Sequence, residues 1–157
     1  MASILIVGIG NTLRGDDGAG PATARRLRES LSADIRVLVK DSDFVSLLED
    51  WRGVDTVVVI DATSSKSEPG FVRQYDAHER PLPAGFSRSS THALGLAEVI
   101  ELGRALGQLP ARLIVIGIEG RDFTAGEALS PEVSEAIDET ARRVIEAIEH
   151  RQSRPGP

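Results

Sequence analysis

The feature that most constrains this chain is an apolar run that leads directly into a glycine-rich turn with two adjacent acids. Residues 4–7 read ILIV, and residues 8–20 continue as GIGNTLRGDDGAG. A short, β-branched and continuously apolar run is typical of a strand that is covered on both faces, as in a parallel sheet. Asp16 and Asp17 stand where the next helix is expected to begin. The turn therefore predicts a strand that delivers two carboxylates to a helix start.

The same alternation of strand and helix continues along the chain. Strand-like apolar runs occupy residues 4–7, 36–39, 56–60 and 113–116, with a weaker, edge-like run at 71–75. Apolar residues spaced by three and four predict helices at about residues 18–31, 44–51, 92–106 and 131–150. This order predicts an α/β fold with a doubly wound, mostly parallel sheet. We expect a single domain over residues 1–150 and a disordered tail over residues 151–157.

The composition excludes several partners and chemistries. The chain has no cysteine, so thiolate nucleophiles, disulfides and thiolate metal sites are excluded, and any metal must be held by oxygen and imidazole. A formal net charge of -6 argues against a nucleic-acid partner, because binding to phosphates needs clustered lysine and arginine. No apolar stretch approaches the ~18 residues of a membrane span, so we expect no membrane partner and a soluble, cytoplasmic protein.

The glycines of the first turn admit two interpretations. Gly8 and Gly10 follow a strand, as in a dinucleotide-binding fingerprint, but Leu13 occupies the position of the third glycine. The other interpretation is structural, since glycine tolerates the positive φ of a sharp strand-to-loop turn. The pattern favours the structural interpretation and leaves phosphate binding as the alternative.

Each candidate side chain also has two interpretations. Asp16 and Asp17 stand where acids cap a helix, although one cap accounts for only one of them. Asp61 ends an apolar strand, where aspartate commonly forms a turn but where ligands also bind in open α/β sheets. His92 stands at an expected helix start, either as a hydrogen-bonded structural residue or as a neutral metal ligand.

Taken together, three of these residues predict a metal site. Asp17, Asp61 and His92 each follow a strand end or open a helix, so we expect them at one rim of the sheet. Two carboxylates and one imidazole suit a divalent ion with open positions, and nickel, zinc and manganese are all compatible. Asp16 is a weaker candidate, as a general base.

These motifs resemble those of the hydrogenase maturation endopeptidases. The resemblance rests on GIGNTLRGDD, VVVIDAT, SSTHALGLAEVIEL, VIGIEG and LSPEV, which together span nearly the whole chain. It implies a twisted five-stranded sheet between helices in three layers. It also implies removal of the C-terminal extension of a nickel–iron hydrogenase large subunit, with the nickel contacted by Asp17, Asp61 and His92. The motif loop contains Gly8, Gly10 and Asn11.

The resemblance further implies that the nickel arrives with the precursor and that no nucleotide cofactor takes part. The later segments are more similar to members that serve soluble or bidirectional hydrogenases. Residues 39–44 read VKDSDF where many members carry an Asp-Gly-Gly-Thr-like turn. Because of this difference, the resemblance does not define how this segment binds the substrate. Water attacking a metal-polarised carbonyl is the simplest mechanism, with metal-bound hydroxide as the alternative. Two other functions stay open, a metal-dependent hydrolase of small molecules and a nucleotide-binding module without catalysis.

Overall fold

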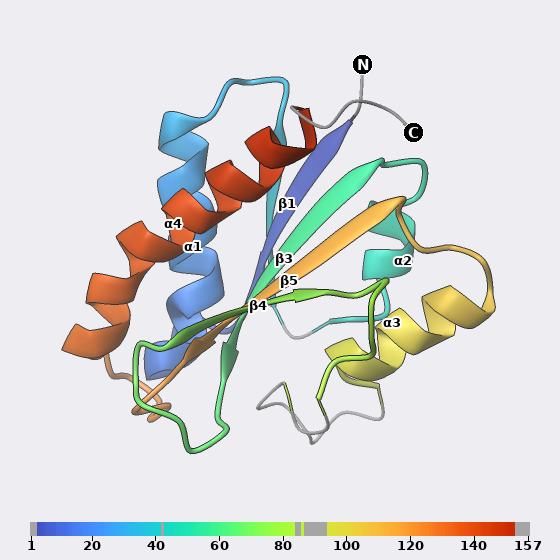
Figure 1. Cartoon of the computed structure of the whole chain (residues 1–157). Coiled ribbons are helices and arrows are strands. Elements are labelled where there is room, and N and C mark those ends of the chain that lie inside the picture. The colour runs from blue at the N-terminus through green and yellow to red at the C-terminus, as the bar shows by residue number, and fades with distance from the viewer. Residues whose placement is uncertain (1–2, 42, 84–85, 87–93, 153–157) are drawn as a thin grey trace.

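The computed structural model describes residues 3–41, 43–83, 86 and 94–152 (Figure 1). The five strands are β1 (Ile4–Ile9), β2 (Arg36–Lys40), β3 (Thr56–Thr63), β4 (Val72–Asp76) and β5 (Arg112–Glu119). The helices are the 3-10 helix η1 (Gly15–Gly18) and the α-helices α1 (Ala19–Ser30), α2 (Leu47–Asp50), α3 (Leu96–Ala105) and α4 (Pro131–Gln152). Across the described residues, no helix combines the length and the hydropathy that a membrane crossing requires.

The strands form one sheet in the order β2-β1-β3-β5-β4. β1, β2, β3 and β5 run parallel, whereas β4 pairs with β5 in the antiparallel direction at the sheet edge. This arrangement confirms the predicted doubly wound, mostly parallel, five-stranded sheet. The parallel strands end together at one edge of the sheet, here named the carboxyl rim, and they begin at the opposite edge, the amino rim.

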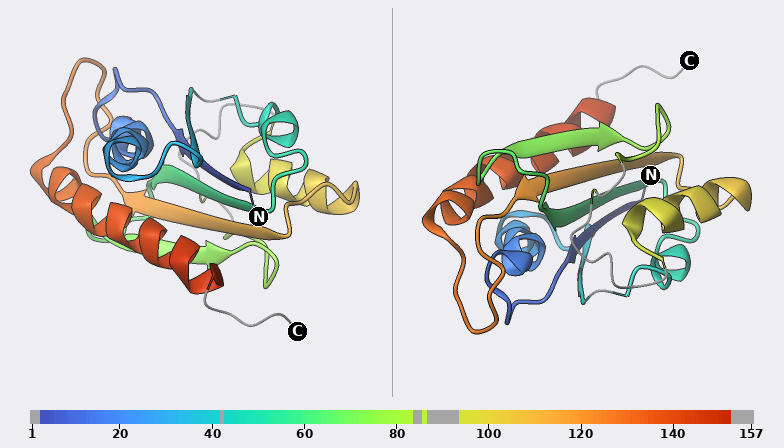
Figure 2. Two further views of the ribbon diagram at one scale, coloured as in Figure 1. Left: turned by 90° about the horizontal axis from the view of Figure 1, so that it is seen from above. Right: turned by 90° about the horizontal axis from the view of Figure 1, so that it is seen from below.

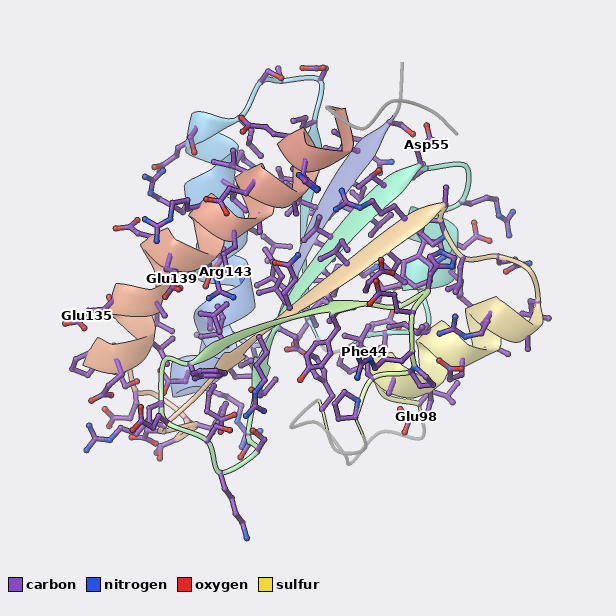
Figure 3. The ribbon with its side chains drawn as sticks, in the orientation of Figure 1. Phe44, Asp55, Glu98, Glu135, Glu139 and Arg143 are labelled. Atoms are coloured by element: carbon purple, nitrogen blue, oxygen red, sulfur yellow. The ribbon has the colours of Figure 1, made fainter. Side chains whose placement is uncertain are left out.

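Helices cover both faces of the sheet, so the fold has three layers (Figure 2). α1 and α4 lie on one face, and α2 and α3 lie on the other (Figure 1). The alternating side chains of β3 divide between two core clusters: Val59 belongs with Trp51 on the α2 and α3 side, and Ile60 belongs with Val144 of α4 on the opposite side. Phe44 lies in the first cluster at 2% exposure, and Figure 3 places it beneath the sheet near α3.

Several boundaries differ from those predicted. α2 is a short turn of helix over Leu47–Asp50, and α3 begins at Leu96 after an extended Gly95. β3 continues to Thr63, because its last residues pair with β5, so Asp61 lies within the strand and does not end it. α4 extends to Gln152, into the expected tail, since arginine and glutamine are good helix formers. Residues 153–157 lie outside the described part of the chain.

Candidate functional site

Asp17 lies at the carboxyl rim, in η1 between β1 and α1. Its side chain is half-buried, and its Oδ2 accepts a hydrogen bond from the backbone N–H of Asn11 at 2.9 Å. The chain that follows rests directly on the sheet. A Cβ added at Gly20 would lie 2.4 Å from the carbonyl oxygen of Ile60 and 2.5 Å from that of Ile9. The start of α1 therefore sits on the ends of β1 and β3, and this contact places Asp17 above them.

Asp61 lies at the same rim, near the end of β3. It is 3% exposed, it pairs in register with Gly117, and its Oδ1 accepts a hydrogen bond from the N–H of Ala62 at 2.8 Å. Because side chains alternate along a strand, Asp61 faces the α2 and α3 side of the sheet, as Val59 does. The structure thus brings Asp17 and Asp61 to one rim, from neighbouring strands. His92 lies outside the described residues, so its place beside them stays a prediction.

The capping interpretation of the two adjacent acids is wrong. In the part of the chain that the structure describes, no side-chain hydrogen bond caps η1 or α1. The carboxylate of Asp17 instead accepts a hydrogen bond from Asn11, in the turn before it. That of Asp16 accepts one from Asp122, far along the chain. These backbone N–H donors take the place of the helix N–H groups that a cap would bind.

Asp16 points into the protein and is 0% exposed. Its Oδ2 accepts hydrogen bonds from the N–H of Arg121 at 2.7 Å, the N–H of Asp122 at 3.0 Å and the hydroxyl of Ser130 at 2.8 Å. Its Oδ1 accepts the N–H of Ser130 at 2.7 Å. Four donors around a fully buried carboxylate indicate a structural role. The general-base role considered for Asp16 stays a prediction that these contacts do not favour.

The glycines of the first turn meet the protein's own backbone. A Cβ at Gly8 would lie 2.3 Å from the carbonyl oxygen of Gly20, and one at Gly10 would lie 1.8 Å from that of Asp17. Gly10 also has a φ of 149°, which favours glycine. Asn11 completes the turn, because its side-chain oxygen accepts the N–H of Leu13 at 2.9 Å. These contacts support the structural interpretation of the glycines over phosphate binding.

A fourth carboxylate lies at the rim, that of Glu119, which was not predicted from the sequence. It ends β5 at 3% exposure and accepts hydrogen bonds from the hydroxyls of Thr63 and Ser65, at 2.9 and 2.7 Å, and from the N–H of Ser65 at 2.9 Å. Glu119 thereby holds the chain that leaves β3 just after Asp61. The signal was present, since VIGIEG places an acid after a buried apolar run, as VVVIDAT does for Asp61.

The rim offers oxygen donors for a divalent cation. Within the described residues, no three histidine or acidic side chains form a group that could hold a metal ion. Asp17 and Asp61 supply two hard carboxylate ligands. The hydrogen bond from Asn11 fixes the position of Asp17, and the pairing of β3 with β5 fixes that of Asp61. Two such ligands suit contact with an ion that a second molecule also coordinates.

The HycI family model, described as hydrogenase maturation protease, matches residues 39–148. HupD of Thiocapsa roseopersicina, a hydrogenase expression/formation protein, is 31% identical over 150 residues, which cover 92% of this chain and 67% of HupD. This chain therefore spans about two thirds of the length of that relative. The hydrogenase 2 maturation protease of Escherichia coli is 29% identical over 149 residues, which cover 92% of this chain and 90% of that protein.

A solved structure has the same fold. The hydrogenase maturating endopeptidase HybD from Escherichia coli superimposes with a TM-score of 0.81 at 27% identity, over 95% of this chain and 93% of that one. The superposition extends over more of the chain than residues 39–148, the segment that the family model matches. Fold and sequence comparisons therefore agree with the resemblance drawn from the motifs.

Proposed function

Because this chain belongs to the hydrogenase maturation protease family, we propose that it removes the C-terminal extension from the precursor of a nickel–iron hydrogenase large subunit. The nickel already bound in the precursor is part of the substrate. The observation that carries the proposal is the placement of Asp17 and Asp61 at one rim, from neighbouring strands of the family's fold.

In the proposed reaction, the two carboxylates contact the nickel that the precursor holds and so place the adjoining peptide bond at the rim. The metal polarises the scissile carbonyl, water adds to the carbonyl carbon, and the C–N bond breaks to leave a new carboxylate and an amine. Asp61 is held by its strand and Asp17 by Asn11, so both ligands are arranged before the precursor binds. His92 would supply the third contact.

The affinity for nickel is expected to reside mainly in the precursor. The chain has no cysteine, and carboxylate and imidazole ligands bind nickel less tightly than a site that includes thiolates. The protease is therefore expected to purify with little bound nickel. A metal-dependent hydrolase of small molecules would instead retain its own ion, so metal analysis of the purified protein separates the two functions.

The test is cleavage of nickel-loaded and nickel-free precursor at the same protease concentration. We expect the loaded precursor to be shortened and the empty one to stay intact, because only the loaded form offers the ion to Asp17 and Asp61. Equal cleavage of both forms would contradict the proposal. The hydrogenase class that is served, soluble or bidirectional, and the cytoplasmic location stay predictions.

Substitution of the two carboxylates provides a second arm of the same experiment. Asp17→Asn and Asp61→Asn each keep the side-chain volume and are expected to slow processing by about 100-fold or more, since a charge that contacts the metal is lost. Asp138→Asn is the matched control, because the Asp138 side chain is 81% exposed on α4 and pairs with Arg26. The control is expected to process precursor at the wild-type rate.

A further inference from the structure

We propose that Asp16 is a positioning residue, whose buried carboxylate holds the turn that carries Asp17 in place at the carboxyl rim. Its effect on cleavage rests on the proposed function, whereas its effect on the turn does not. The two adjacent acids then have separate tasks. Asp17 lies half-buried at the rim as a ligand, and Asp16 is fully buried and sets the position of Asp17.

All the hydrogen bonds to the carboxylate of Asp16 come from one distant segment of the chain, residues 121–130. Its four hydrogen bonds, between 2.7 and 3.0 Å, come from both ends of that segment: Arg121 and Asp122 at the start and Ser130 at the end. A buried ionised carboxylate carries a large desolvation cost unless it is well bonded. Three backbone N–H groups and one hydroxyl offset this cost and leave the segment little freedom to move relative to Asp16.

Backbone hydrogen bonds extend the same contact along the turn. The N–H of Gly15 donates to Glu127 at 3.1 Å, the N–H of Asp16 donates to Asp122 at 2.8 Å, and the N–H of Gly126 donates to Leu13 at 2.8 Å. The packing is close as well, since a Cβ at Gly15 would lie 2.3 Å from the carbonyl oxygen of Asp122. The turn is therefore joined to residues 121–130 at Leu13 and Gly15 as well as at Asp16.

The link from Asp16 to Asp17 is short. The two residues are consecutive in η1, and the other end of the turn is tied to Asp17 by the hydrogen bond from Asn11. A shift of the backbone at residue 16 must therefore move the Asp17 carboxylate or lengthen that bond. Because misplacement of a reacting group by about 1 Å can lower a rate by as much as 100-fold, the inward acid bears on catalysis without touching substrate.

The test is Asp16→Asn, which keeps the volume but turns an N–H₂ group toward N–H donors. In ¹H–¹⁵N spectra we expect the Asn11 amide to shift, because it reports the bond to Asp17, along with the amides of Arg121 and Asp122. On loaded precursor we expect kcat to fall by about tenfold or more while KM changes by less than about twofold.

Two further variants make the test specific. Val144→Ala, on the buried face of α4 at 0% exposure, is expected to lower Tm without changing kcat or the chemical shift of the Asn11 amide. Ser130→Ala removes one of the four donors to Asp16 and is expected to change both readouts in the same direction, by less than Asp16→Asn. Should Asp16→Asn not fold, Ser130→Ala decides the question alone.

The proposal is overturned if Asp16→Asn, or Ser130→Ala in its place, leaves the Asn11 amide unmoved and reduces kcat no more than Val144→Ala does. The two proposals fail separately. If the wild-type protein leaves loaded precursor intact, the proposed function is wrong, and the Asn11 amide still decides whether Asp16 positions the turn.

Discussion

The two rims of the sheet are built in different ways. At the carboxyl rim, Asp16, Asp61 and Glu119 are at most 3% exposed, and two of them bond segments more than 50 residues away in the chain. At the amino rim, turns are closed by near neighbours, as when the Ser32 hydroxyl donates to Asp34. Ser3 and Asp55 exchange exposed hydrogen bonds there at 3.2 and 3.1 Å, and Figure 3 shows Asp55 at that end. Both rims thus have polar contacts between distant parts of the chain, but those of the carboxyl rim are made by buried carboxylates, whereas those between Ser3 and Asp55 are exposed.

Two glycines at each rim differ in how closely the protein packs around them. Gly10 and Gly15, at the carboxyl rim, both have positive φ. A Cβ added at either glycine would also lie only 1.8 or 2.3 Å, respectively, from a backbone carbonyl oxygen. Gly53 and Gly107, at the amino rim, also have positive φ, of 74° and 66°, but an added Cβ would meet no described atom within 4 Å. At Gly53 and Gly107 the backbone conformation alone restricts substitution, whereas at Gly10 and Gly15 packing against backbone restricts it as well.

The largest effect is expected from Gly10→Ala. The new Cβ would collide with the carbonyl of Asp17, which is backbone and cannot rotate away, and φ would be strained in addition. We expect a loss of about 4 kcal/mol or more in the free energy of unfolding, together with loss of processing. Urea unfolding and the precursor assay on the same preparation measure both.

Gly53→Ala and Gly107→Ala are the controls for this substitution. Each carries only the cost of a positive φ, about 1–2 kcal/mol, and processing is expected to continue at the wild-type rate. If Gly10→Ala proves no more costly than these two, the contrast between the rims does not lie in backbone packing.

A smaller effect is expected at Glu119. Glu119→Ala leaves the Thr63 hydroxyl and the Ser65 N–H without their acceptor and is expected to destabilise the protein by about 3 kcal/mol. Glu119→Gln keeps one acceptor oxygen and should cost about 1–2 kcal/mol. The matched control is Glu49→Gln in α2, since the ion pair of Glu49 with Arg52 is exposed and is expected to contribute less than about 0.5 kcal/mol. A cost for Glu119→Gln as small as that of Glu49→Gln would show that this carboxylate does not hold the rim.

Features of the fold that depend on neighbouring residues could be predicted from the sequence, and those that depend on contacts between distant residues could not. Apolar runs are local, so the strands, their common direction and the rim that carries Asp17 and Asp61 could be inferred from the chain alone. The orientation of Asp16 could not, because its partner Arg121 lies 105 residues away and capping is the usual local explanation for such an acid. The extra length of β3 was missed for the same reason, since Thr63 pairs with Glu119.

The smallest effect is expected from two exposed aspartates, Asp122 near the carboxyl rim and Asp34 at the amino rim. The Thr124 hydroxyl and N–H, at 2.6 and 2.9 Å, lower the pKa of Asp122, and the Ser32 hydroxyl lowers the pKa of Asp34. A carboxyl whose pKa is lower in the folded state contributes stability above its unfolded pKa, near pH 4, and loses it as the pH falls through the folded value.

Asp122→Asn and Asp34→Asn should therefore each cost a little stability at about pH 7 and progressively less as the pH falls to about 3, as measured by urea unfolding across that range. We expect the two variants to behave alike, because both carboxylates lie in solvent, where such contacts are weak. A much larger cost for Asp122→Asn would extend the long-range network of the carboxyl rim from its buried carboxylates to its exposed side chains. Equal, small costs would confine that network to Asp16 and Glu119, the acids that are bonded across the chain.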